Sequence, residues 1–488
     1  MLQPSETGWG IFALSGGPTQ RLEPKMDTAA SLFEPAWLKT RIKRHVRELV
    51  RLAVPAVMMR IGLMALAMVD TAMVGHYATQ HLAWLNLANQ SIIMTALVTG
   101  LGLLSGITIY TANAYGGADF RGAGKVWQRS LPFALVLGLL LVLVCWPAET
   151  WLTYLGQSED NARVSGELVQ ILALGLPGHA LFVNCTMFLE GIKRGHVGFY
   201  LMLGANIVNL LLNYMLIFGE WGAPELGAAG SAWASTGVRW FMALSALAFV
   251  WYAPSLRKFH VREPHGQKLS EWRDQRQMGY ASGVSLAAEV LAFSALSIFC
   301  GWLGTVPLAS FGVVYQVLGI PLMISIGIGV ASSVRVGIAL SRRDGRDAAL
   351  ASITGIAVTF AVVGAMAIGI FLLIGPLIAI FTDDVRIVTL LVPIAAIYVM
   401  GMLFDAAQMV ASMILRGYKE TWWPTYLQAT AFIAVMLPMS YTLGIYFERG
   451  FRGLMEGMTI GVIVSFALQV VRFWHLARIE MQKEAKRA

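Results

Sequence analysis

Long apolar runs follow one another from residue 39 onward, and short polar segments separate them. About 20 apolar residues are needed to cross a bilayer, and only helices or closed barrels satisfy their backbone there. Barrel strands alternate over about 10 residues, whereas these runs are longer and continuously apolar. The pattern therefore predicts an all-α membrane protein with twelve transmembrane helices. We place them near residues 48–74, 80–113, 126–146, 162–190, 196–219, 226–252, 277–303, 307–340, 349–375, 386–415, 422–446 and 453–474.

A weak internal repeat relates the two halves of the chain at an offset of 226 residues. Leu189-Glu190-Gly191-Ile192-Lys193 returns as Leu415-Arg416-Gly417-Tyr418-Lys419, and Asp119 matches Asp344 after a one-residue slip. Six helices per copy give both copies the same orientation in the membrane, so the axis that relates them runs along the membrane normal. We therefore expect two six-helix bundles, which are the lobes of a transporter.

The remaining segments are polar and lack helical periodicity. The N-terminal lobe is predicted at 39–253 and the C-terminal lobe at 277–478, with a basic cytoplasmic linker at 254–276. Residues 1–38 are predicted to be a disordered tail, within which Met26 is an alternative start, and residues 479–488 form a second cytoplasmic tail.

The composition agrees with a membrane protein, because 57% of the residues are apolar and only 13% are charged. In soluble domains, about a quarter of the residues are charged. The net charge of +8 reflects topology rather than nucleic-acid binding, because most Lys and Arg residues fall in loops on one side. The opposite loops hold only Arg163, Arg386, Arg449 and Arg452. We predict a multi-pass protein of the cell inner (plasma) membrane with both termini in the cytoplasm.

Acidic residues inside the predicted spans are the main candidates for chemistry. A charge at the bilayer centre costs at least about 2.5–3.5 kcal/mol, so Asp70, Glu289 and Asp405 need an explanation. Glu289 shares a helical face with Ser285, and Asp405 shares one with Gln408. Two carboxyl groups that face one cavity can exchange protons or hold a dehydrated cation. Burial favours the protonated form of an acid, whereas a bound cation favours the ionised form. Competition between the two is a physical basis for coupling.

These acids also have structural interpretations, namely an ion pair within one lobe or a protonated, hydrogen-bonded acid. In the first lobe, Asn209 and Asn213 form a polar stripe that Asp70 can face, although asparagines in membrane helices often only join helices. His179 is either a proton carrier or a packed histidine. Trp84 can bind a lipophilic cation through its ring, or it faces lipid or packs helices.

Several other functions lack their sequence signals. No P-loop run is present, so the chain does not carry its own ATPase, and we expect neither an enzyme nor a cofactor. A major facilitator or a flippase of lipid-linked precursors is an alternative transporter. A membrane-embedded lipid enzyme would need a denser catalytic cluster near one interface, and a scaffold would tolerate replacement of Glu289 and Asp405.

Four stretches resemble motifs of the multidrug and toxic compound extrusion (MATE) family, and most closely its NorM-type branch. They are Val69-Asp70-Thr71-Ala72-Met73-Val74-Gly75, Leu189-Glu190-Gly191 together with the asparagine-bearing helix 5, Gly222-Ala223-Pro224-Glu225-Leu226-Gly227, and Ile414-Leu415-Arg416-Gly417-Tyr418-Lys419. The resemblance covers residues 41 to 478. It implies two six-helix bundles around a V-shaped cavity, and efflux driven by inward flow of Na⁺ or H⁺.

The family's functional residues map onto the acids identified above. Asp70 matches the helix-1 aspartate, and Glu289 and Asp405 match the cation-coupling acids of the C-terminal lobe, where Na⁺ is a possible ligand. Some members have a tyrosine four residues before the helix-10 aspartate, but this chain has Gly401 there, with Tyr398 nearby. The resemblance implies a monomer that exports small lipophilic or cationic drug-like compounds.

Overall fold

The structure is a computed structural model, and it describes residues 35–263, 272–379 and 384–486. Over these residues it is all-helical, with eleven helices that are long and apolar enough to cross a membrane. A twelfth span is formed by Glu159–Ala173 and Leu176–Gly191 together, which meet at an angle of 41°. The twelve predicted membrane helices and the all-α fold class are confirmed.

The first half of the chain forms six membrane passes from ten α-helices. They are α1 (Pro35–Tyr77), α2 (Thr79–Ala88), α3 (Met94–Leu104), α4 (Gly106–Gly116), α5 (Phe120–Cys145), α6 (Ala148–Tyr154), α7 (Glu159–Ala173), α8 (Leu176–Gly191), α9 (His196–Phe218) and α10 (Ala228–Tyr252). The second pass comprises α2, a π-helical segment at Asn89–Ile93, α3 and α4. The short helix α6 lies in the connection between the third and fourth passes.

The second half repeats this plan with nine α-helices. They are α11 (Arg273–Leu303), α12 (Thr305–Ser341), α13 (Gly345–Leu372), α14 (Ile374–Ala379), α15 (Val385–Leu391), α16 (Ala395–Gly417), α17 (Trp423–Ala429), α18 (Leu437–Tyr441) and α19 (Gly450–Ala485). The eleventh pass is irregular, because π-helical segments at Thr430–Met436 and Thr442–Tyr446 follow α17 and α18. Single π-turns are often found at functional sites.

The predicted tails and linker lie partly outside the described residues. Of the expected tail 1–38, residues 1–34 fall outside, and α1 already begins at Pro35. The predicted linker 254–276 includes a 3₁₀ helix at Pro254–Phe259 and the start of α11, and its residues 264–271 fall outside. Helix α19 continues to Ala485, so much of the expected C-terminal tail is helical.

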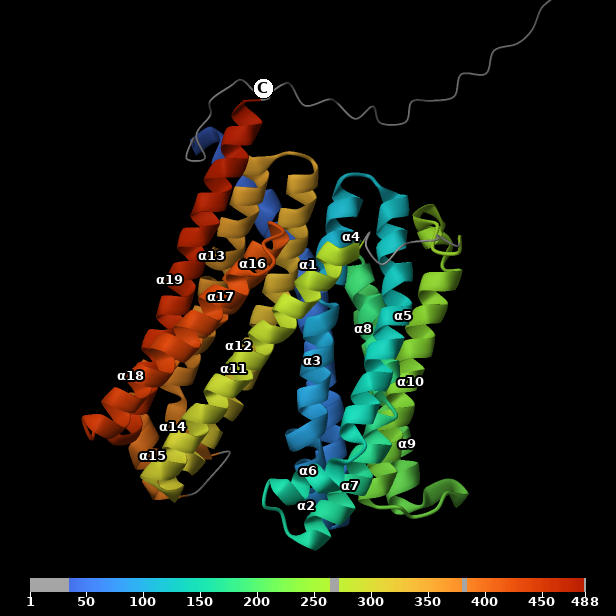
Figure 1. The fold of residues 1–488 in the computed structure, drawn as a ribbon, viewed down its shortest axis with the longest axis vertical. Helices are drawn as coiled ribbons and strands as arrows, with labels where there is room; N and C mark the ends of the chain where they lie inside the picture. Colours follow the sequence, from blue (N-terminus) through green and yellow to red (C-terminus); the bar gives the residue numbers. More distant parts are fainter. Residues whose placement is uncertain (1–34, 264–271, 380–383, 487–488) are drawn as a thin grey trace, which may run out of the picture.

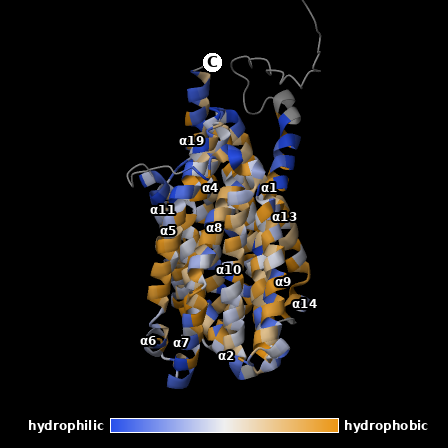
Figure 2. Ribbon diagram, turned by 90° about the vertical axis from the view of Figure 1, so that its right-hand side faces the viewer, coloured by the Kyte–Doolittle hydropathy of each residue, from blue (hydrophilic) through white to orange (hydrophobic). Residues whose placement is uncertain are grey.

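Two lobes are visible in Figure 1, one from each half of the sequence. Each has its own apolar core, with Trp127 and Phe188 central in the first and Phe432 and Met436 in the second. Figure 2 shows hydrophobic residues along the middle of the helices and hydrophilic residues toward their ends. This arrangement is the one expected of helices that are surrounded by lipid on their outer faces.

Equivalent residues of the repeat have the same structural roles in both lobes. Asp119 and Asp344 each cap a helix, and each accepts a backbone N–H three residues further on at 2.7 Å. Lys193 and Lys419 each follow a helix in the left-handed conformation, with φ of 61° and 65°. The weak sequence repeat therefore reflects a true duplication of local structure.

The lobes meet at one end of the molecule and diverge at the other (Figure 1). The end where they meet carries α1's start, α19's end and the loops 117–119, 192–195, 342–344 and 418–422, and we call it the basic end. There α1 packs on α12, and α3 and α4 pack on α11 and α12. A Cβ at Gly102 would lie 2.9 Å from Cα of Gly283, so these backbones touch.

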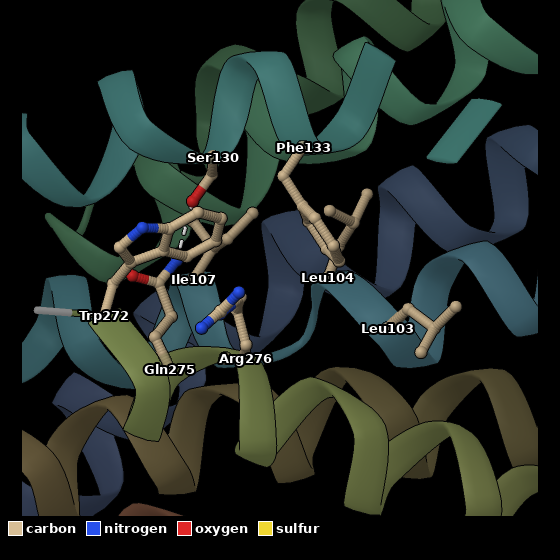
Figure 3. Close-up of a pocket in the computed structure, with 9 residues that line it drawn as sticks. Leu103, Leu104, Ile107, Ser130, Phe133, Trp272, Gln275 and Arg276 are labelled. Carbon is tan, nitrogen blue, oxygen red and sulfur yellow. Dashed lines mark hydrogen bonds between the residues drawn. The ribbon is translucent and has the colours of Figure 1, made fainter. Parts of the chain in front are cut away.

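Polar contacts reinforce the junction between the lobes at the basic end. Gln275, near the start of α11, donates to the Ser130 hydroxyl at 2.6 Å and accepts from Arg129 Nε at 2.6 Å. Figure 3 shows Gln275 and Ser130 around a small crevice together with Trp272 and Arg276. In the adjoining loops, burial lowers the pKa of Lys193 and raises that of Asp344.

Candidate functional site

Asp70 on α1 is the centre of a buried polar cluster in the first lobe. Its Oδ1 accepts hydrogen bonds from Asn209 at 2.9 Å and from Asn213 at 2.6 Å, both on α9. Its Oδ2 accepts from the hydroxyl of Ser235 on α10. Asp70 is only 6% exposed and both asparagines are fully buried. Three donors on two neighbouring helices therefore face a single carboxylate.

Arg239 is the cation whose charge acts on this cluster. It is on α10, one turn after Ser235, and its Nη1 donates to the carbonyl of Leu172 at 2.8 Å. His179 on α8 is partly buried and lies within electrostatic reach of Arg239 and Arg60. The charges of two arginines thus act on His179, and among the described residues no hydrogen bond joins its ring to the Asp70 cluster.

Glu289 on α11 is held by an amide from the eleventh pass. Gln428 on α17 donates its Nε2 to Oε2 of Glu289 at 2.7 Å, and its own Oε1 accepts from the hydroxyl of Ser285. Ser285 is one turn before Glu289 on α11, as the sequence predicts. Gln428 and Ser285 are 3% and 2% exposed, whereas Glu289 itself is partly buried.

Asp405 on α16 has a similar amide neighbour. Gln408 Nε2 donates to Oδ1 of Asp405 at 3.3 Å, while Gln408 Oε1 accepts from Gln469 at 3.2 Å and from Ser465 at 3.3 Å. Gln469 and Ser465 are on α19, and both are fully buried with Gln408. Helix α19 therefore fixes the orientation of the amide that faces Asp405.

The charge of Asp405 acts on Glu289, although the two acids come from different helices. Arg416, near the end of α16, is the cation whose charge acts on Glu289, and its Nε and Nη2 are buried without a hydrogen-bond partner. Tyr315 on α12 feels the charges of both acids. The charges of two carboxyl groups and one arginine thus act on one another in the second lobe, with both acids in the middle of their helices.

Two predicted residues lie apart from the acids. The indole of Trp84 on α2 donates to Asn161 on α7 at 3.0 Å, near the end of the lobe opposite the basic end. The hydroxyl of Tyr398 on α16 donates to the carbonyl of Val314 at 3.4 Å, and Tyr398 is 3% exposed. Both polar groups are occupied by neighbours within their own lobe.

Sequence reasoning missed four members of these clusters, namely Ser235, Gln428, Ser465 and Gln469. Each is a single polar side chain in an apolar helix, and neither spacing nor charge distinguishes it from a solvated or structural residue. The amides of Gln428 and Gln469 inside predicted spans were a usable signal, because a buried amide in a membrane needs partners.

The comparisons with known proteins agree with this architecture. The MatE family profile matches residues 55–215 and 281–442, and the two matches begin 226 residues apart, which is the offset of the sequence repeat. The chain belongs to the MATE family. Its MATE membership makes it a membrane transporter rather than an enzyme, and it confirms the resemblance inferred from the motifs.

Relatives and solved structures cover almost the whole chain. A probable multidrug resistance protein NorM from Caulobacter vibrioides is 31% identical over 92% of this chain and 95% of its own length. The multidrug resistance protein PmpM of Pseudomonas aeruginosa is 28% identical over 90% and 93%. The eukaryotic MATE transporter AtDTX14 has the same fold, with a TM-score of 0.80 at 20% identity, over 90% of this chain and 99% of its own.

Proposed function

We propose that this protein exports small lipophilic and cationic drug-like compounds in exchange for cations that flow inward. The relatives named as multidrug resistance proteins support the substrate class. The observation that carries the coupling is that the charge of Asp405 acts on Glu289, with both acids inside membrane spans. Two negative charges that act on each other in a medium of low dielectric constant are unfavourable. The two acids therefore take up a cation or a proton.

The orientation follows from the distribution of basic residues. Lys and Arg gather at the basic end, so the positive-inside rule assigns that end and both termini to the cytoplasm. The protein then lies in the inner (plasma) membrane, where it works as a monomer because one chain contains both lobes. The lobes meet on the cytoplasmic side and diverge on the outer side (Figure 1), which supports an outward-directed state.

Alternating access then needs two states with different affinities for drug and cation. Binding of the cation at Glu289 and Asp405 removes the repulsion between the acids and favours release of the drug. A preference of a few kcal/mol between the two states is enough to shift their populations by orders of magnitude. The Asp70 cluster is a second acidic site, in which Asn209 and Asn213 hold the carboxylate and the charge of Arg239 acts on it.

Transport by purified protein in liposomes tests the proposal. We expect export of a fluorescent cationic dye to follow an imposed cation gradient, and to fall at least tenfold in Glu289→Gln and Asp405→Asn. Glu149→Gln is the matched control, because Glu149 is an exposed acid on the short helix α6. Export at the wild-type rate by both acid variants would show that the pair does not couple transport.

A further inference from the structure

Glu289 and Asp405 are the acids at which a coupling cation would bind, and Na⁺ is one ion that transporters of this kind use. Hard cations such as Ca²⁺ and Mg²⁺ take six or more oxygen ligands, and neutral oxygens from amides, hydroxyls and carbonyls usually complete the shell. The neighbours of the acid pair therefore decide whether a metal ion fits between the carboxylates.

The amide of Gln428 presents nitrogen rather than oxygen to Glu289. Its Nε2 donates to the carboxylate at 2.7 Å, and its oxygen accepts from Ser285. A serine in a membrane helix often donates to the carbonyl four residues earlier, as Ser282 does to Met278 at 2.9 Å. For Ser285 that carbonyl belongs to Ala281, and Thr425 already donates to it at 2.7 Å. Ser285 is thereby directed toward the oxygen of Gln428.

The amide next to Asp405 is oriented in the same way as the amide next to Glu289. The oxygen of Gln408 accepts from Gln469 and Ser465, so Gln408 also turns its N–H toward Asp405. Tyr398 directs its hydroxyl to Val314, and Gly401 has no side chain to offer.

Among the described residues of these two networks, two side-chain oxygens are buried without a partner, and they belong to Ser412 and Gln469. Ser412 is seven residues beyond Asp405 on α16, which is about 10 Å along the helix. Gln469 bonds to Gln408 rather than to either acid. Neither oxygen belongs to a group that bonds to either acid, so these two amide networks offer Na⁺ no neutral oxygen beside the carboxylates.

We propose that Ser285 and Gln428 make the Glu289–Asp405 pair selective for protons over Na⁺, because they turn an amide N–H, and no amide oxygen, toward the carboxylate. This inference rests on the proposed function, since it concerns the same pair. A proton needs one carboxylate oxygen and no further ligand, whereas a sodium ion would face the hydrogens of two amide groups. Ser285 is the residue that selects the orientation of the Gln428 amide.

The variant Ser285→Ala tests whether the Ser285 hydroxyl fixes the orientation of the Gln428 amide. Without the hydroxyl, the Gln428 amide is free to rotate and present its oxygen to an ion between the acids. We expect Ser285→Ala to gain Na⁺ binding that depends on the acids and is at least tenfold tighter than any binding seen with wild type, measured by isothermal titration of the purified full-length protein at constant pH. Ser282→Ala is the matched control, because Ser282 is three residues earlier on α11 and donates only to its own helix. Gln428→Leu removes both the donor and the oxygen, and we expect no gain of Na⁺ binding.

The wild-type protein is expected to show no Na⁺ binding that depends on the pair, and its export in liposomes is expected to follow a pH gradient. Na⁺ binding by wild type that both Glu289→Gln and Asp405→Asn abolish would overturn the inference. A Ser285→Ala protein that binds Na⁺ no better than Ser282→Ala would overturn it as well. Failure of the proposed function has a different signature, namely export that is insensitive to loss of either acid.

Discussion

His45 of α1 and Asp347 of α13 are joined across the two lobes, with His45 Nε2 2.9 Å from Asp347 Oδ1. Arg335 of α12 donates to His45 Nδ1 and, at 2.8 Å, to the His45 carbonyl. A guanidinium has only donors, so Nδ1 is the acceptor and Nε2 carries the proton that Asp347 accepts. Arg44 donates to the same Asp347 oxygen at 2.8 Å. The start of the first lobe is thus tied to two helices of the second.

We predict that Asp347→Asn weakens the closed basic end. Asp347 is 22% exposed, so losing its charge should cost about 1–3 kcal/mol, less than the 3–5 kcal/mol typical of a fully buried pair. The open population should rise about ten- to hundredfold. The measurement is labelling of a cysteine at position 112 with an impermeant maleimide applied from the basic end, because Ala112 is fully buried where α4 meets α12.

The control for this experiment is Arg47→Gln, because Arg47 is an exposed residue of the same helix. Labelling requires a background in which the three native cysteines, all buried, are replaced by alanine. Equal labelling rates in Asp347→Asn and Arg47→Gln would show that the His45–Asp347 contact does not hold the lobes together.

The contact between α11 and α3 is a second part of the junction between the lobes. Its close backbone packing should make it as sensitive to substitution as the His45–Asp347 contact. A Cβ at Gly279 of α11 would clash with the carbonyl of Leu103 on α3. Backbone atoms on both sides leave no flexible side chain to move aside, so we predict that Gly279→Ala separates α11 from α3 and raises labelling at position 112 at least tenfold. Gly301→Ala on the same helix is the control, since nothing lies within 4 Å of its Cβ position. Unchanged labelling in Gly279→Ala would show that the contact between α11 and α3 does not keep the basic end closed.

The fold was largely predictable because lipid imposes a simple rule on sequence. Every span must be long and apolar, so the twelve passes and their connections followed from hydropathy alone. The bend of 41° between α7 and α8 falls just before Pro177, and a proline inside an apolar run is a common cause of such a kink. The repeat was readable because pairs such as Asp119 and Asp344 have capping roles that few other residue types fill.

The candidate site was less predictable, because carboxylates are conspicuous in an apolar chain and their neutral partners are not. Asp70, Glu289 and Asp405 stood out by charge, whereas Ser235 and Gln428 are polar residues of ordinary appearance. Which helices pack together decides which of these residues reach an acid, and helix packing does not follow from the periodicity of one helix. The π-helical segment after α17 is likewise a local irregularity that no residue pattern announced.

Gly401 lies close against α19, which leaves little room for a side chain at this position. A Cβ at Gly401 would lie 2.8 Å from the Thr459 hydroxyl on α19, and that hydroxyl donates to the carbonyl of Ile397 at 3.1 Å. We predict that Gly401→Ala lowers thermal stability by displacing this bond, at a cost of about 1–3 kcal/mol. The double variant Gly401→Ala with Thr459→Ala should recover part of the loss. An unchanged melting temperature of Gly401→Ala in detergent would show that α16 and α19 accommodate the added methyl group without displacement.

Ser235 provides a test of the Asp70 cluster that is independent of the acid pair. A hydrogen bond to a charged group contributes about 1.5–3 kcal/mol, so Ser235→Ala should destabilise the ionised carboxylate relative to the protonated one. The acid then keeps its proton to higher pH. If Asp70 exchanges protons during transport, the pH at which export is half-maximal should rise by about one unit or more, since one unit corresponds to about 1.4 kcal/mol.

The matched control for Ser235→Ala is Ser231→Ala. Ser231 is one turn earlier on α10 and fully buried, and its hydroxyl has no hydrogen-bond partner. Both variants remove the same atom from the same helix, so a general loosening of α10 would affect them alike. Only a hydroxyl that donates to Asp70 produces a shift in Ser235→Ala alone. Parallel pH profiles of the two variants would therefore remove Asp70 from the proton-exchange step, and Asn209 and Asn213 would then serve to join α9 to α1.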